Sequence, residues 1–208
     1  LAAMADANGR DLSQFRNWYS QAGTPRVKVE EQYDSAKKQF HLTLTQSCAP
    51  SPGQPEKKPF HIPLKVRLIT ANNDQAEQLL ELTQTIQTWT FDNIEERPVL
   101  SINRDFSAPI NLDFEQSEED LLTLFTGDDD RWEAGQKLAM RMILNNRLPD
   151  AKLIEAYRNL LLDPDLDPAF KDLALTLPAE TYLYEQCATV DPQQIFASRR
   201  AFRKEIAK

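Results

Sequence analysis

Residues 40–45 read FHLTLT and residues 62–68 read IPLKVRL, so apolar and polar side chains alternate along both stretches. A period of two places the apolar side chains of a strand on one face, which a core can bury. Val27 and Val29 show the same alternation upstream. Residues 34–37, which read DSAK, suit a hairpin between that run and the one at Phe40. The middle of the chain is therefore predicted to form antiparallel strands.

Further short runs extend this β region to about residue 115. Strands are predicted at residues 85–91, 99–103 and 110–114, and residues 72–82 are predicted to be a loop. Pro63 interrupts the donor pattern of its run, which predicts an edge strand or a bulge there. Six or seven short strands with no long helix between them are typical of an antiparallel, immunoglobulin-like β-sandwich.

The chain changes to helical spacing on both sides of the β region. In residues 1–24, Leu12, Phe15 and Tyr19 fall on one face after a potential N-cap at Asp11. Gly23 is expected to end that helix, because Pro25, two residues later, cannot continue it.

From residue 116 onward the sequence predicts short helices joined by short links. Ser117 begins a stretch similar to a capping box, and Asp167-Pro168 and Asp191-Pro192 each place a capping acid before a proline. Three apolar stripes follow at helical spacing: Trp132, Gly135, Ala139, Met142 and Ile143; Leu153, Ala156, Tyr157, Leu160 and Leu161; Phe170, Leu173, Ala174 and Leu177. Residues 116–208 are therefore predicted to be helical hairpins stacked like the start of a solenoid.

Composition narrows the classes of partner. Against 32 acidic residues there are 24 Lys and Arg, a net charge of -8, which argues against nucleic acid or an anionic membrane as the main partner. The apolar runs are far too short to span a bilayer. Two cysteines in separate predicted domains and no signal-peptide pattern favour the cytoplasm. The opening Leu1-Ala2-Ala3-Met4 suggests that the chain is part of a longer protein.

Metal-binding patterns are missing from the sequence. The nitrogen and sulfur ligands are His41, His61, Cys48 and Cys187, with no Cys-x-x-Cys, His-x-x-x-His or His-Glu-x-x-His among them. The acidic runs 128–130 and 163–167 fail the calcium-loop pattern, which requires Gly at its sixth position and Glu at its twelfth. We expect these acids to complement helix N-termini, and we predict no metal ligand in the chain.

Nucleophiles and phosphate loops are equally absent. There is no Gly-x-Ser-x-Gly, and five glycines in all leave no phosphate-cradling loop. Cys48 lacks a nearby histidine in its proline-rich loop, and Cys187 is predicted to be a small core residue on a short helix. No catalytic or cofactor-binding residue is therefore predicted.

Other side chains leave alternatives open. Arg199, Arg200, Arg203 and Lys204 form a basic cluster that suits a solvated last helical turn or a contact with a neighbouring domain. Trp89 and Phe91 share one strand face, which favours core residues but allows a binding module for a peptide or sugar. Tyr182 and Tyr184 would mark the surface of a helical interaction scaffold.

Six blocks, in this order, resemble the bacterial aminopeptidase N family of zinc-dependent gluzincin aminopeptidases. Residues 15–25 resemble the junction that leaves the catalytic domain, residues 106–110 the last strand of the β-sandwich, and residues 130–136 the opening of the helical domain. The blocks read FRNWYSQAGTP at 15–25, FSAPI at 106–110, DRWEAGQ at 130–136, DPA at 167–169, LPAE at 177–180 and DP at 191–192.

The resemblance implies a larger hydrolase that removes N-terminal amino acids from peptides. Its zinc, held by two His and one Glu, and its general base lie in the His-Glu-x-x-His region, which this chain lacks. The resemblance divides the chain into a helical tail of the catalytic domain (1–24), the β-sandwich (25–115) and the first part of a helical domain (116–208) that continues past Lys208. The expected partners are the missing catalytic domain and the peptide substrates, with the sandwich as spacer and the helices as chamber wall.

Overall fold

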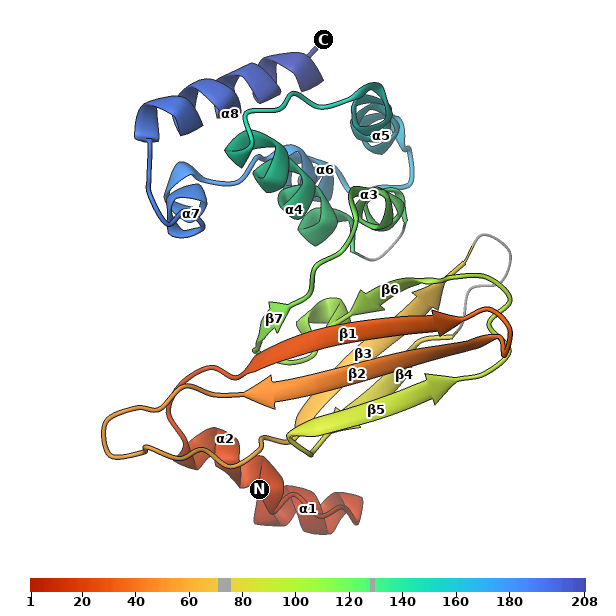
Figure 1. The fold of residues 1–208 in the computed structure, drawn as a ribbon, viewed down its shortest axis with the longest axis vertical. Helices are drawn as coiled ribbons and strands as arrows, with labels where there is room; N and C mark the ends of the chain where they lie inside the picture. The colour runs from red at the N-terminus through yellow and green to blue at the C-terminus, as the bar shows by residue number, and fades with distance from the viewer. Residues whose placement is uncertain (71–75, 128–129) are drawn as a thin grey trace. The chain divides into compact units, whose positions relative to one another are not determined.

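The computed structural model describes residues 1–70, 76–127 and 130–208, in which two compact units form, Leu1–Glu115 and Gln116–Lys208 (Figure 1). The first unit contains two sheets that pack face to face, in the orders β5-β2-β1-β7 and β4-β3-β6. All strand pairs are antiparallel except β1–β7, which is parallel. The strands are β1 (Arg26–Asp34), β2 (Gln39–Ser47), β3 (Ile62–Ile69), β4 (Gln78–Leu82), β5 (Ile86–Phe91), β6 (Val99–Ile102) and β7 (Asn111–Asp113). The predicted β-sandwich is confirmed.

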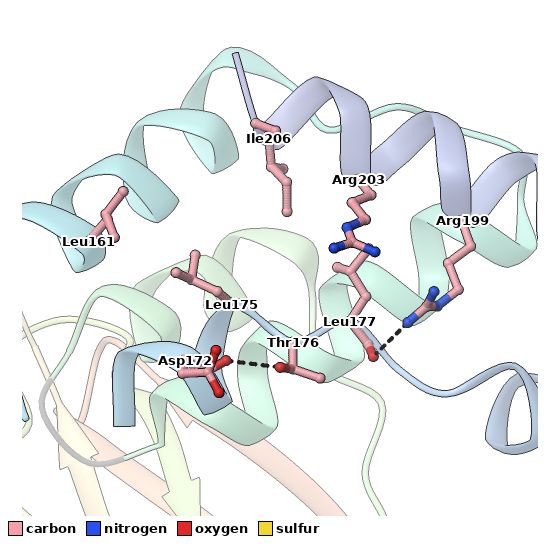
Figure 2. Close-up of a pocket in the computed structure, with 9 residues that line it drawn as sticks. Leu161, Asp172, Leu175, Thr176, Leu177, Arg199, Arg203 and Ile206 are labelled. Carbon is pink, nitrogen blue, oxygen red and sulfur yellow. Dashed lines mark hydrogen bonds between the residues drawn. The ribbon is translucent and has the colours of Figure 1, made fainter. Parts of the chain in front are cut away.

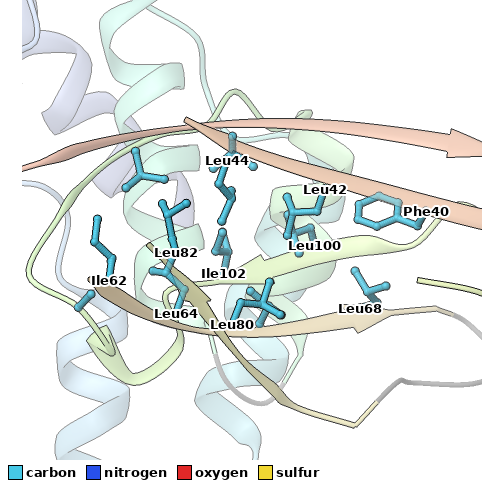
Figure 3. Close-up of a cluster of buried hydrophobic side chains, with 14 of the residues drawn as sticks. Phe40, Leu42, Leu44, Ile62, Leu64, Leu68, Leu80, Leu82, Leu100 and Ile102 are labelled. Carbon is cyan, nitrogen blue, oxygen red and sulfur yellow. The ribbon is translucent and has the colours of Figure 1, made fainter. Parts of the chain in front are cut away.

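The core of this unit lies between the two sheets. Phe40, Leu42 and Leu44 of β2 face the other sheet and are 1% exposed or less. Opposite them are apolar residues of β3, β4 and β6 (Figure 3), including Ile62, Leu64, Leu68, Leu80, Leu82, Leu100 and Ile102. Burying each of these side chains stabilises the fold by about 1.5–3 kcal/mol. The alternation that opens the sequence therefore builds the core.

A buried amide closes one end of the sandwich. Gln46 of β2 is 4% exposed. Its Nε2 donates to the carbonyl oxygens of Phe60 (2.9 Å) and Gln84 (3.0 Å), and its Oε1 accepts from the Phe60 N–H at 2.7 Å. One side chain thus satisfies backbone groups of two loops that would otherwise be buried without partners.

Two strand predictions were wrong. Residues 72–82 were expected to form a loop, but Gln78–Leu82 is β4, because Leu80 and Leu82 point into the core while Leu79 is exposed. Its five residues alternate over too short a run to stand out in the sequence. Of the predicted loop, residues 72–75 lie outside the described ranges.

Pro63 is not on an edge strand, since β3 lies between β4 and β6. However, β6 pairs only with residues 66–69 of β3. The Lys65 N–H points to that side of β3 and donates to Ser107 Oγ (3.0 Å). Backbone directions alternate along a strand, so the Pro63 nitrogen faces the same side, beyond the end of the β6 pairing. No ladder hydrogen bond to β6 is therefore lost at Pro63.

The N-terminal segment is helical in pieces: α1 (Ala2–Asn8), η1 (Gln14–Arg16) and α2 (Asn17–Ser20). Gly9, in the left-handed conformation, ends α1, and α2 ends at Ser20 instead of the predicted Gly23. Polar side chains of this segment hydrogen-bond to backbone groups of the loop before β3. Gln21, for example, donates to the Lys58 carbonyl (2.9 Å) and accepts from the Lys58 N–H.

The second unit consists of α3 (Glu118–Thr126), α4 (Arg131–Leu144), α5 (Ala151–Leu162), α6 (Pro168–Leu175), α7 (Glu180–Glu185) and α8 (Pro192–Ile206). The predicted caps are confirmed: Ser117, Asp167 and Asp191 each accept a hydrogen bond from a backbone N–H of the helix they begin. The stripes are mostly buried, but Leu161 and Leu173 are 53% and 50% exposed. No helix within the described ranges is long and apolar enough to cross a membrane.

Helices α3, α4 and α5 meet at an aromatic contact. The rings of Phe125 and Tyr157 lie edge to face with their centroids 4.8 Å apart. Gly135 of α4 faces the Phe125 ring so closely that an added Cβ would lie 2.8 Å from Phe125 Cε2. Glycine is therefore required for the close approach of α4 to Phe125.

Candidate functional site

The potential metal ligands in the described part of the chain do not cluster. His41 Nδ1 lies 2.9 Å from Thr90 Oγ1 on the outer face of the sandwich, and His61 Nε2 lies 3.8 Å from Glu81 Oε1. Within residues 1–70, 76–127 and 130–208, no three His, Cys, Asp or Glu side chains gather in a group that could hold a metal ion. The zinc implied by the resemblance does not fit the residues described.

Each cysteine thiol lies near a backbone carbonyl oxygen. Cys48 Sγ lies 3.7 Å from the Ala22 carbonyl oxygen, and Cys187 Sγ lies 3.5 Å from that of Leu183. Cys187 follows the end of α7 and is partly exposed, so its prediction as a helical core residue was wrong.

The acidic runs are divided among several roles. Asp128 and Asp129 lie outside the described residues, and Asp130 is the N-cap of α4. Asp167 caps α6 as expected, whereas Asp163 follows the last residue of α5 and pairs with Arg131 across 3.4 Å. The expectation of a helix N-terminus was therefore wrong for Asp163.

The aromatic candidates differ in accessibility. Trp89 and Phe91 pack against the sandwich core, with Phe91 6.2 Å from Phe40 between ring centroids. Tyr184 donates to Glu180 (3.2 Å), and Tyr182 is 47% exposed. Tyr182 lines a cavity of about 340 Å³ together with Trp132, Met140 and Pro178. Two polar groups there already have partners, since Gln136 donates to the Thr176 carbonyl and Lys137 pairs with Glu133.

A larger cavity, of about 430 Å³, lies among α5, α6 and α8 and contains part of the predicted basic cluster (Figure 2). We call it the α8 cavity. Aliphatic side chains and two arginines line it, with Asp172 and Thr176 at its wall. The lining residues are Leu161, Asp172, Leu175, Thr176, Leu177, Arg199, Arg203, Ile206 and Ala207.

The basic residues of α8 have different environments. Arg199 donates from Nε to the Pro178 carbonyl (2.8 Å) and from Nη2 to the Leu177 carbonyl (3.3 Å), so it fixes the link between α6 and α7. Arg203 is exposed and its side chain reaches into the α8 cavity (Figure 2). Arg200 and Lys204 are exposed and do not line it.

The basic cluster is evident in the sequence, whereas the cavity was not predicted from it. Two signals point to it: Arg199 and Arg203 are four residues apart on one helix face, and Leu161 extends an apolar stripe beyond what the helical core buries. The cavity also needs α5, α6 and α8 to surround one space, which residue spacing within one helix does not reveal.

Each unit matches a known domain family. Residues 23–115 match DUF3458, a domain of unknown function with an Ig-like fold. Residues 118–208 match DUF3458_C, a domain of unknown function described as ARM repeats.

The whole chain is also similar to longer proteins. It is 35% identical to aminopeptidase N of Escherichia coli (strain K12) and covers 26% of that protein. It is 42% identical to aminopeptidase N of Caulobacter vibrioides and covers 25% of it. Legionella pneumophila aminopeptidase A, solved in complex with aspartic acid, matches 99% of the chain with a TM-score of 0.84 and 25% identity. In that structure too, the matched region is 25% of the protein chain.

The chain thus spans about a quarter of the relatives it matches, and both of its units fall within the matched region. It contains no His-Glu-x-x-His or other active-site motif. The chain therefore consists of the Ig-like DUF3458 domain followed by the ARM-repeat DUF3458_C domain, and over its whole length it is similar to one region of aminopeptidase N.

Proposed function

We propose that this chain serves as the spacer and part of the chamber wall of a zinc-dependent aminopeptidase, whose catalytic domain cleaves N-terminal amino acids from peptides. The observation that carries the proposal is 35–42% identity along the whole chain to a quarter of aminopeptidase N, combined with a sequence that contains no catalytic motif. In this proposal the zinc and every catalytic residue belong to the catalytic domain, and the partners of this chain are that domain and the peptide substrates.

Each of the three proposed domains has its own proposed role. Residues 1–24 would be the helical tail of the catalytic domain, residues 25–115 the spacer, and residues 116–208 the first part of the helical wall. The tightly packed core of the sandwich supports a spacer role, because packed interiors are stiff and transmit strain. Stacked short helices suit a curved wall, since solenoid-like stacks form extended concave surfaces.

Deleting residues 116–208 from the full-length enzyme tests the role of the wall. A wall that restricts access makes the enzyme cleave short peptides and spare folded proteins. We expect the truncated enzyme to gain activity on the N-terminus of a folded protein, while it still hydrolyses an aminoacyl anilide. Retained anilide hydrolysis is the control that the catalytic domain is intact. If the truncated enzyme is active and discriminates between short peptides and folded proteins as before, the proposed role of the helices as a chamber wall is refuted.

The isolated chain gives a separate test of the non-catalytic assignment. After extensive dialysis we expect negligible bound zinc, by elemental analysis, and no release of amino acids from aminoacyl anilides. Stoichiometric zinc together with peptide hydrolysis by the isolated chain would overturn the assignment.

We also propose the cytoplasm as its compartment, which is supported by the two free cysteines, Cys48 and Cys187.

A further inference from the structure

The α8 cavity carries an excess of positive charge, because two arginines, Arg199 and Arg203, line it against one acidic residue, Asp172. Arg203 forms no hydrogen bond or ion pair with any residue that the structure describes. Arg199, one turn earlier, already donates to the Leu177 and Pro178 carbonyls, but carbonyl oxygens leave its net charge in place. A guanidinium offers a planar pair of N–H donors that matches a carboxylate. The polar part of the cavity is therefore suited to an anion.

The rest of the lining is aliphatic. Figure 2 shows Leu161 of α5 on the side of the cavity away from the two arginines, Ile206 next to Arg203 on α8, and Leu175 and Leu177 on the chain that passes below α8. Leu161 is 53% exposed, although it belongs to the apolar stripe of its helix. A ligand that covered this side chain would remove apolar surface from water, which is favourable by about 25 cal/mol per Å². The volume of about 430 Å³ lies within the range of small-molecule sites.

We propose that the α8 cavity binds an aliphatic carboxylate, with the carboxylate on Arg203 and the alkyl group on Leu161, Leu175 and Ile206. Two sources share this chemistry: a free alkyl acid, and the terminal carboxylate of a peptide that ends in an aliphatic residue. The site is independent of zinc hydrolysis and goes beyond the role proposed above.

Asp172 sets the charge selectivity of this site. Asp172 also lines the cavity and makes no ion pair with Arg199 or Arg203. A second negative charge on the ligand, placed away from Arg203, would meet either Asp172 or the aliphatic wall. The cavity should therefore prefer a monocarboxylate with an apolar tail to a dicarboxylate of the same length.

The experiment titrates the 208-residue chain with octanoate and, separately, with N-acetyl-leucine, and follows the methyl NMR signals of Leu161, Leu175 and Ile206. We expect saturable shifts with at least one of the two acids. Octanol and N-acetyl-leucinamide, which lack the carboxylate, should bind at least tenfold more weakly. Suberate, the dicarboxylate of octanoate's chain length, should also bind more weakly.

A matched pair of variants assigns the binding to the cavity. Arg203→Gln should weaken binding about tenfold, because a charge-assisted hydrogen bond is lost. Arg200→Gln removes the same charge from the same helix outside the cavity and should change affinity less than twofold. Both arginines are exposed, so neither change should affect folding, which circular dichroism checks.

Each outcome decides the proposal. Binding of octanoate alone identifies alkyl acids as the source, binding of N-acetyl-leucine alone identifies peptide termini, and binding of both supports the shared chemistry. The proposal is overturned if neither acid shows saturable binding, or if Arg203→Gln and Arg200→Gln have equal effects.

Discussion

At the scale of single residues, the side-chain amide of Gln46 should contribute strongly to the stability of the sandwich. In Gln46→Met, the Phe60 N–H and the carbonyl oxygens of Phe60 and Gln84 lose their partner in a buried place. We expect the free energy of unfolding to fall by about 3 kcal/mol, because each unpaired buried group costs about 1–3 kcal/mol. Urea unfolding, followed by tryptophan fluorescence in a Trp132→Phe background, reports on the sandwich.

The control for this change is Gln32→Met on the exposed face of β1. It alters the same chemical group and should shift stability by no more than about 0.5 kcal/mol. Equal effects of the two substitutions would show that the Gln46 hydrogen bonds do not stabilise the sandwich.

Ionisation of the buried Tyr157 phenol should destabilise the helical unit at high pH. Burial raises the pKa of Tyr157 far above its ordinary value of 10.0. The folded state therefore keeps the proton that the unfolded chain loses above pH 10, so this contribution to stability is present below pH 10 and is lost as the pH rises further. Tyr157→Phe keeps the ring contact with Phe125 and removes the titration.

We expect the wild-type chain to lose about 1 kcal/mol more stability than Tyr157→Phe between pH 8 and pH 11. Urea unfolding followed by circular dichroism at 222 nm measures the difference. Tyr184, whose pKa is raised by desolvation and by its hydrogen bond to Glu180, is present in both proteins and cancels. Equal losses in the two proteins would contradict the burial of the Tyr157 phenol.

At the scale of elements, Gly135 decides how closely α4 approaches Phe125. Alanine is the better helix former by about 1 kcal/mol, so an open position would be stabilised by Gly135→Ala. Here the new Cβ would lie 2.8 Å from a ring that is 1% exposed and held by Tyr157. Overpacking costs about 1–3 kcal/mol, so we expect a net loss of about 1 kcal/mol in urea unfolding.

The loss should come from the clash alone. Adding Phe125→Leu, which shortens the facing side chain, should make Gly135→Ala less harmful than it is beside phenylalanine. If Gly135→Ala raises stability in the wild-type background, the ring is free to move and the close approach is not required.

Some elements of the fold could be predicted from the sequence, and others could not. Strands β2 and β3 are evident because the alternation runs over six or more residues, and the caps of α3, α6 and α8 are local. Strand β4 was missed because its five residues carry a short pattern, and Pro63 was placed on an edge because the length of its neighbour β6 cannot be read from β3 itself. The α8 cavity depends on how three helices pack, which helical spacing leaves undetermined.

At the scale of the whole molecule, the parallel pairing of β1 with β7 has a mechanical consequence. Arg26 lies beside Asn111 and Lys28 beside Asp113, so the first and last strands of the sandwich run in the same direction. Tension that pulls the chain backward at Pro25 and forward at Phe114 drives these strands past one another. Their hydrogen bonds then bear the load together, as in a shear joint, instead of opening one after another like a zipper. The sandwich can thus resist stretching between its two ends.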